Sequence, residues 1–186
     1  MDLLVEAKRS NKQAFYELVN KYSHIFYKTA RVFFTDDKEV YPILEKSLLQ
    51  AFKDLVNVKD EKEFLCWTLR IIIFDCTKQK ERFSKDYRKK LENREIAVSI
   101  TDKVAISESA VNNFEYQEYR KSSVVEEYIT SIEPSARIPS LLYFYADLSI
   151  EDISKILKNS ENEIAEIIKK SRIKIYEMIK NKEVDL

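Results

Sequence analysis

Apolar side chains recur at the spacing of an α-helix along most of the N-terminal half. From Ser10 or Asn11 they keep a 3.6-residue period for about five turns, and a second set with this period runs from Ile43 to Leu55. After Asp60, residues 64–74 are apolar nearly all round. The pattern predicts three long helices, with the third at the buried centre of their bundle.

Two further helix starts lie in residues 148–164 of the C-terminal half. Ser149 is followed three residues later by Asp152, and Ser160 is followed in the same way by Glu163. Each pair is typical of a helix N-cap, where a side chain satisfies a free backbone N–H. About three residues separate the two helices, which is the length that a helix-turn-helix uses. The segment is therefore either a DNA-reading unit or an ordinary helical hairpin.

The pattern changes between the two halves. Eight basic and four acidic residues lie between Lys78 and Glu95, with Phe83 and Tyr87 among them. Basic residues interleaved with aromatic ones suit contact with phosphates and unstacked bases, although a merely solvated segment is the alternative. Weak periodicity and many polar residues follow up to residue 123, which indicates a linker. We expect domains at 1–84 and 124–183, joined by a linker at 85–123.

Composition narrows the class of protein. The absence of glycine and the three prolines disfavour β-rich folds and favour an all-α protein. The 32 basic and 32 acidic side chains cancel, so any nucleic-acid surface must be local. No apolar run approaches the roughly 20 residues of a membrane span, and the first residues lack a signal-peptide pattern. We therefore expect a cytoplasmic protein.

The residues needed for common enzyme chemistry are scarce. Without glycine, neither a P-loop nor a dinucleotide fingerprint can form. The only histidine is His24, and the two cysteines, Cys66 and Cys76, lie ten residues apart in an apolar helix. These residues form no zinc or histidine-based catalytic constellation. We expect no enzymatic activity, no catalytic residues, no metal, no cofactor and no small-molecule substrate.

The order of the parts resembles the extracytoplasmic-function (ECF) type of the sigma-70 family of RNA polymerase sigma factors. Toward the N-terminus, Ala14 to Leu18, Ala51-Phe52 and Trp67 with Arg70-Ile71 resemble segments of region 2. The C-terminal residues that fall in register with region 4 are Pro134, Arg137, Leu141, Leu142, Tyr145, Leu148, Ser149, Asp152, Ile153, Ser154, Leu157, Ser160, Ile164 and Arg172.

This resemblance implies a region 2-like three-helix bundle and a region 4-like helix-turn-helix, joined by a flexible linker. It implies an alternative sigma factor that binds core RNA polymerase at the β′ clamp helices and the β flap. Such a bacterial protein directs promoter-specific transcription initiation through the −10 and −35 elements of promoter DNA. An anti-sigma factor is a further implied partner. The alternative is a sigma-like co-regulator or adaptor that has lost autonomous promoter recognition.

The resemblance also assigns site residues to three surfaces. Those implied to bind core polymerase are Glu39, Glu45, Lys46, Gln50 and Lys53. Those implied to contact the −10 element are Arg70, Lys78, Lys80 and Arg82. Those on the recognition helix for the −35 element are Ser160, Glu161, Asn162, Glu163, Glu166, Lys169, Lys170, Arg172 and Lys174.

The chain departs from the family pattern on all three surfaces. A Gln–acidic pair becomes Glu45-Lys46, and the Asn and Asp expected after Trp67 become Phe74 and Lys78. The recognition helix begins with several acidic residues, which repel phosphates, although Glu can accept a hydrogen bond from cytosine N4. Its later lysines and arginine either contact phosphates, which position a helix without specifying sequence, or form a solvated face. These departures favour the adaptor alternative.

Overall fold

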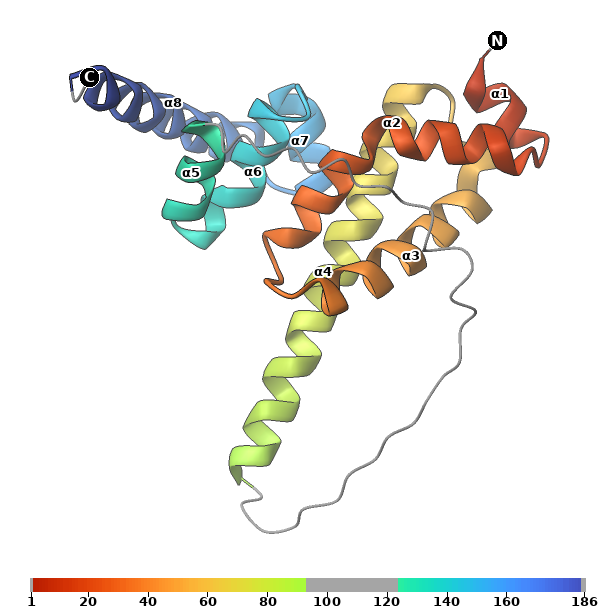
Figure 1. Ribbon diagram of the computed structural model, residues 1–186, viewed down its shortest axis with the longest axis horizontal. Coiled ribbons are helices and arrows are strands. Elements are labelled where there is room, and N and C mark those ends of the chain that lie inside the picture. Colours follow the sequence, from red (N-terminus) through yellow and green to blue (C-terminus); the bar gives the residue numbers. More distant parts are fainter. Residues whose placement is uncertain (1, 93–123, 185–186) are drawn as a thin grey trace.

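The computed structural model describes residues 2–92 and 124–184, and its elements within these ranges are all helical (Figure 1). The N-terminal half contains α1 (Leu3–Lys8), α2 (Lys12–Arg31), α3 (Asp37–Asp54), the 3₁₀ turn η1 (Leu55–Asn57) and α4 (Glu61–Glu92). The C-terminal half contains α5 (Val124–Ser131), α6 (Pro134–Phe144), α7 (Ile150–Leu157) and α8 (Glu161–Val184). The predicted all-α fold class is confirmed.

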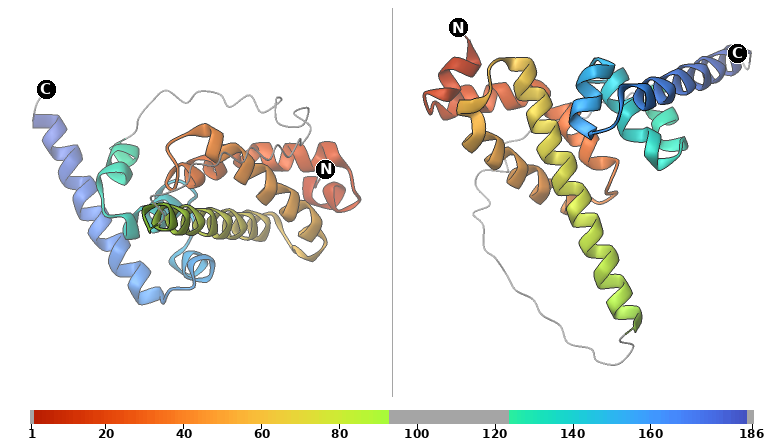
Figure 2. Two further views of the ribbon diagram at one scale, coloured as in Figure 1. Left: turned by 90° about the horizontal axis from the view of Figure 1, so that it is seen from below. Right: turned by 180° about the vertical axis from the view of Figure 1, so that it is seen from behind.

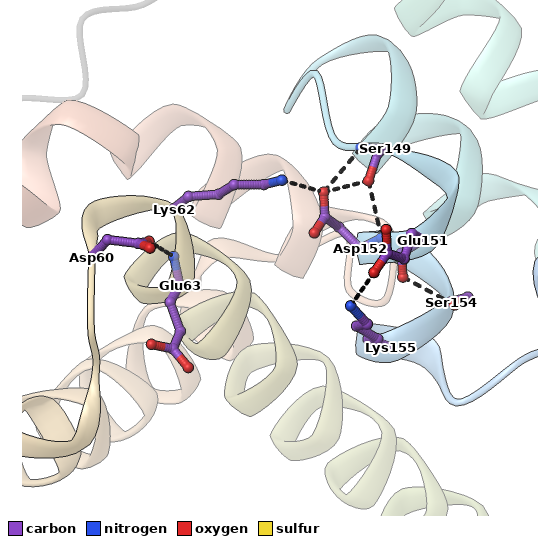
Figure 3. A network of polar contacts seen from close by, with 8 residues as sticks. All are labelled: Asp60, Lys62, Glu63, Ser149, Glu151, Asp152, Ser154 and Lys155. Atoms are coloured by element: carbon purple, nitrogen blue, oxygen red, sulfur yellow. Dashed lines mark hydrogen bonds and ion pairs between the residues drawn. The ribbon is translucent and has the colours of Figure 1, made fainter.

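Short polar side chains begin the helices of the N-terminal half. The Asn11 side chain accepts hydrogen bonds from the backbone of Gln13 and Ala14 at the start of α2. Asp36 caps α3 in the same way. At the start of α4, the Asp60 carboxylate accepts from the Glu63 N–H at 2.7 Å (Figure 3). Each cap satisfies an N–H that a helix end leaves free.

An aromatic cluster fills the core of this half. Phe64 of α4 is fully buried, and its ring centroid lies 6.1 Å from that of Phe15 and 6.4 Å from those of Tyr22 and Phe26. Edge-to-face and tilted contacts of this kind add to the stability that burial provides. The cluster packs α2 against α4 and so fixes the relative position of these two helices.

Helix α4 is central but is not covered on all sides. It contacts α2, α3 and α7, which bury Phe64, Leu69 and Ile72. On its remaining side, Trp67 is 36% exposed and Phe74 is 63% exposed. The predicted central position of this helix is confirmed, but its burial is incomplete, because the three neighbouring helices leave one side of α4 open.

The C-terminal half ends in the predicted helix-turn-helix. Ser149 and Asp152 form a capping box at the start of α7, and Lys158 ends this helix in the left-handed region with φ 57°. Upstream, Pro134 occupies the first turn of α6, and Pro139 lies buried inside the same helix. Pro134 is tolerated in the first turn because the N–H that it lacks has no partner there.

The two halves share a hydrophobic core cluster in the structure, and a second cluster lies within the C-terminal half. Ile153 and Ile156 of α7 belong to the same buried cluster as Phe64 and Leu69 of α4. Figures 1 and 2 show α7 beside α4, with α1 and the end of α8 at opposite ends of the molecule. The first residues of the predicted linker, up to Glu92, continue α4. The rest of that linker, 93–123, lies outside the described residues, and the proposed domain limits stay predictions.

Candidate functional site

The five residues assigned to polymerase binding lie on the outer side of α3. Lys46, Gln50 and Lys53 are exposed, and Glu39 and Glu45 are half-buried. The opposite side of the helix packs into the bundle through Val40, Ile43, Leu44, Ser47 and Ala51. The helical period of the sequence therefore turns the assigned side chains outward.

A buried carboxylate ties this helix to α4. The Asp75 side chain is only 9% exposed, and its Oδ1 lies 2.6 Å from the Lys46 Nζ. The Ser47 hydroxyl donates to Asp75 Oδ2 at 2.9 Å. A buried charge is costly unless it is paired and hydrogen-bonded, and both conditions are met here. Asp75 was not predicted from the sequence, although an acidic residue directly after an apolar helical run was the available signal.

Two of the four residues assigned to the −10 element stack on aromatic rings of their own helix. The Arg70 guanidinium lies 5.9 Å from the Trp67 ring centroid, and the Lys78 ammonium lies 5.7 Å from that of Phe74. Cations at this distance are attracted by the ring face. The two pairs form a cationic and aromatic stripe on the open side of α4. Lys80 and Arg82 are exposed further along the helix.

A groove of about 960 Å³ brings two of the predicted sets together. It lies between α3, α4 and the end of α7. The assigned residues that line it are Glu45, Lys46, Gln50 and Lys53 from α3, with Arg70 and Lys78 from α4. Glu39, Lys80 and Arg82 are not among its lining residues. The resemblance assigned the two sets to separate surfaces, and this common groove was not predicted from the sequence.

The first turn of α8 is organised by a second capping interaction. The Glu163 carboxylate accepts hydrogen bonds from the Ser160 N–H and hydroxyl, each at 2.9 Å. The bond from the Ser160 backbone is the main cause that lowers the pKa of Glu163 below its usual value. Glu163 thus keeps its negative charge at the helix N-terminus, where it is favourable. Glu161, Asn162 and the capping residues themselves are exposed.

Basic side chains occupy the exposed face of α8 from its third turn onward. Lys169 lies 4.0 Å from Glu166, while Lys170 and Lys174 point to solvent as exposed residues. The Arg172 guanidinium donates to the Tyr143 hydroxyl and lies 5.1 Å from the ring centroid of that residue. The residues assigned to the −35 element thus lie at the N-terminus of α8 and along it. The helix is acidic in its first turn and basic further on, and none of these residues lines the groove.

The cysteines and acidic residues offer no reactive or metal-binding group in the described part of the chain. Burial raises the pKa of Cys66 to about 11 and that of Cys76 to about 12, so both remain thiols near neutral pH. Within residues 2–92 and 124–184, no cluster of three metal-ligating side chains occurs. No helix in these ranges has the length and apolar character needed to cross a membrane.

Comparison with known proteins identifies the fold. No protein-family model matches the chain, and no curated protein matches its sequence. Among solved structures, the chain is similar to that of CnrH, an ECF sigma factor, in complex with the cytosolic domain of CnrY. The TM-score is 0.59, the sequence identity is 17%, and the match covers 96% of each chain. The described helices therefore have an ECF sigma-like fold.

Proposed function

We propose that this chain is an alternative sigma factor, which binds core RNA polymerase and directs it to specific promoters. The observation that carries the proposal is the similarity of the described helices to the fold of an ECF sigma factor, in a match that covers 96% of the chain. A helix-turn-helix with a capping box at α7 and a capped α8 lies at its C-terminal end. A sigma factor requires a polymerase-binding surface and two DNA-binding surfaces, and each has a candidate here.

The outer face of α3 is the candidate polymerase surface. The Lys46–Asp75 ion pair and the Ser47 hydrogen bond hold α3 against α4. This attachment pre-organises Gln50 and Lys53, which are exposed. We expect the β′ clamp helices to dock on this face, because a rigid helix loses little conformational freedom on binding.

The stripe on α4 is the candidate −10 surface. Trp67 and Phe74 present partly exposed rings on which unstacked bases can stack. Arg70 and Lys78 lie beside these rings and can neutralise neighbouring phosphates. Lys80 and Arg82 extend the positive charge along the helix. Melted DNA would thus meet stacking and electrostatic contacts together.

Helix α8 is the candidate −35 surface. Lys169, Lys170 and Lys174 supply phosphate contacts, which position the helix without specifying sequence. Arg172 joins them only after it leaves Tyr143, to which it is bonded in the structure. The cytosolic domain of CnrY bound to CnrH supports a further partner, an anti-sigma factor that restrains the chain.

Run-off transcription tests the proposal. Purified protein, core polymerase and genomic promoter fragments should give discrete transcripts that neither component gives alone. Replacing Lys169, Lys170 and Lys174 by Glu should weaken DNA binding and reduce the dependence of affinity on salt. Lys12→Glu, at an exposed position at the start of α2, serves as the control. If the protein neither comigrates with core polymerase nor supports any transcript, the proposal fails.

A second candidate is an adaptor that works with another sigma factor. It is favoured by the first turn of α8, where Glu161 and Glu163 are exposed and Glu163 is engaged in the cap. Acidic side chains in the first turn of a recognition helix repel the phosphates of DNA. Affinity purification that recovers a second sigma factor, together with no binding to promoter DNA, would support this candidate over the first.

A further inference from the structure

We infer that a second hollow, at the boundary between the two halves, is a binding site for a nucleoside polyphosphate. The hollow has a volume of about 720 Å³, within the range of about 300–1,000 Å³ that small-ligand sites usually have. The end of α2 and the helix α4 line it from the N-terminal half, and α5 and α6 line it from the C-terminal half. Its positive charge, its ordered donors and its apolar wall together define the ligand.

The lining of this hollow is rich in positive charge. Among the described residues that line it, Glu127 is the one acidic residue, and the basic residues are Lys28, Arg31, Lys80 and Arg137. The basic residues come from α2, α4 and α6, so helices far apart in the sequence bring their charges to one place. Like charges gathered in this way repel one another, and an anion bound among them removes that repulsion.

The Arg137 side chain is held in place by the backbone beside the hollow. Its Nε donates to the Ile132 carbonyl at 3.0 Å, and its Nη2 donates to the Thr130 carbonyl at 3.3 Å. A guanidinium has five N–H donors, so these two bonds fix the side chain and leave other donors for a ligand. A fixed guanidinium suits phosphate in particular, because phosphate oxygens accept two parallel N–H bonds from it.

The other three cations differ in how firmly they are held. Arg31 donates to the Thr35 carbonyl, and its guanidinium lies 3.7 Å from the Asp37 carboxylate. Lys28 is half-buried, and this burial lowers its pKa, as expected for a cation that has lost part of its hydration. Lys80 is exposed, and no ion pair within the described residues engages it. A chain of phosphates would therefore meet two guanidinium groups and two ammonium groups.

An apolar wall accompanies these charges. Ile129 and Leu141 are buried members of the cluster within the C-terminal half, and the half-buried Val32 packs against both clusters. Phe33 adds a half-buried ring to the lining. A nucleotide base can pack against a ring and aliphatic side chains, whereas inorganic phosphate cannot. The combination of wall and charge therefore favours a nucleotide over a simple anion.

The charges line one hollow and do not follow an extended row. A strand of nucleic acid needs a groove whose charges track its backbone, whereas Arg31 and Arg137 belong to different halves and line a single hollow. A small ligand suits this arrangement better. It would contact both halves and favour their packed arrangement, because it binds that arrangement more tightly than a separated one.

Calorimetric titration of the full chain with ATP, in buffer without Mg²⁺, tests the inference. ATP should bind at least about tenfold more tightly than adenosine, because adenosine has no phosphate groups for the cations of the lining. Inorganic triphosphate should bind more weakly than ATP, because it leaves the apolar wall uncovered. The urea concentration at the midpoint of unfolding should also rise with ATP, since the ligand binds the folded chain.

Substitutions in the full chain locate the binding site. Arg31→Gln combined with Lys80→Gln removes two lining charges at exposed positions and should weaken ATP binding about tenfold or more. The matched control, Lys8→Gln combined with Arg9→Gln, removes the same charges at exposed positions outside the lining and should bind as the unmodified chain does. Circular dichroism checks that both variants fold. Glu127→Gln should tighten ATP binding at least about twofold, a gain that misfolding cannot produce.

Several results would overturn the inference. These are no binding of ATP, equal affinity for adenosine, a lining variant that binds as tightly as its control, or no gain with Glu127→Gln. Equal affinity for inorganic triphosphate would make the hollow a site for simple anions, and tighter binding of a single-stranded oligonucleotide would make it a nucleic-acid surface. The site does not require the proposed function: ATP binding by a chain that supports no transcript leaves the site intact and removes the sigma assignment.

Discussion

The two halves of the chain are stabilised in different ways. The N-terminal half packs large rings, with Phe15, Tyr22 and Phe26 around the fully buried Phe64. The C-terminal half buries mainly aliphatic residues, such as Ile153 and Ile164, and begins its last two helices with matched Ser–acidic caps. The N-terminal half therefore depends on an aromatic core, whereas the C-terminal half combines a smaller core of its own, around Tyr128, Ile129 and Ile175, with helix caps and contacts to its neighbour.

The difference is greatest for α7. This helix has eight residues, which is too short to be stable alone in water. Its buried residues Ile153 and Ile156 lie in the core cluster that includes α4, and Lys62 of α4 forms an ion pair with Asp152 at 2.7 Å (Figure 3). The stability of α7 therefore depends on contacts with the N-terminal half. This dependence can be tested.

The largest expected effect is in the aromatic core. Phe64→Ala should lower the free energy of unfolding by about 3–5 kcal/mol, because it leaves a cavity among three rings. Urea denaturation followed by circular dichroism measures this loss. Phe74→Ala on the same helix is the control, and its ring is 63% exposed. A change within about 0.5 kcal/mol is expected for the control, and equal losses for the two variants would contradict the assignment of the core.

Ile153→Ala tests whether the halves unfold together. The side chain is fully buried, so its truncation should cost about 2–5 kcal/mol. Because its cluster includes residues of α4, we expect a single transition in which both halves lose structure at one midpoint. Trp67 fluorescence reports on the N-terminal half and far-ultraviolet circular dichroism on all helices. Two separate transitions would show that the shared core contributes little.

The helices and their starts could be predicted from the sequence because they depend on local patterns. The caps at Ser149 and Ser160 form as their spacing predicted, and Asn11, one of the two predicted starts, caps α2. The groove could not be predicted in this way, because periodicity gives the faces of a helix but not the neighbours that cover them. For the same reason, the exposure of Phe74 and the pairing of Asp75 with Lys46 were missed.

The two serine caps provide a smaller and more local test. Ser149→Ala and Ser160→Ala should each lower the free energy of unfolding by about 1 kcal/mol, because each leaves a helix N–H without its acceptor. Chemical denaturation measures both variants, and Ser→Asp at either position should restore much of the loss. If Ser149→Ala costs no more than a surface change such as Ser23→Ala, the cap does not stabilise α7.

The smallest expected effect is the pH dependence of the contact between Lys62 and Asp152. Burial alone would raise the pKa of Asp152, but hydrogen bonds from Lys62 and Ser149 outweigh burial and leave the pKa below its usual value of 3.8. A lowered folded-state pKa means that the carboxylate stabilises the fold above the pKa of the unfolded chain. This contribution is lost as the pH falls through the lower, folded value.

Asp152→Asn isolates this contribution, because the amide oxygen can still accept the cap hydrogen bonds but carries no charge for Lys62. The unmodified chain should be more stable than the variant near neutral pH, and the difference should shrink as the pH falls below the usual Asp pKa of 3.8 and through the lower, folded value. In a chain that carries Lys62→Met, Asp152→Asn should cause a much smaller loss of stability, because the two changes break the same ion pair. Denaturation series at each pH measure these values. A difference that stays constant across this range would show that Asp152 acts through the cap alone, and that the ion pair does not hold the two halves together.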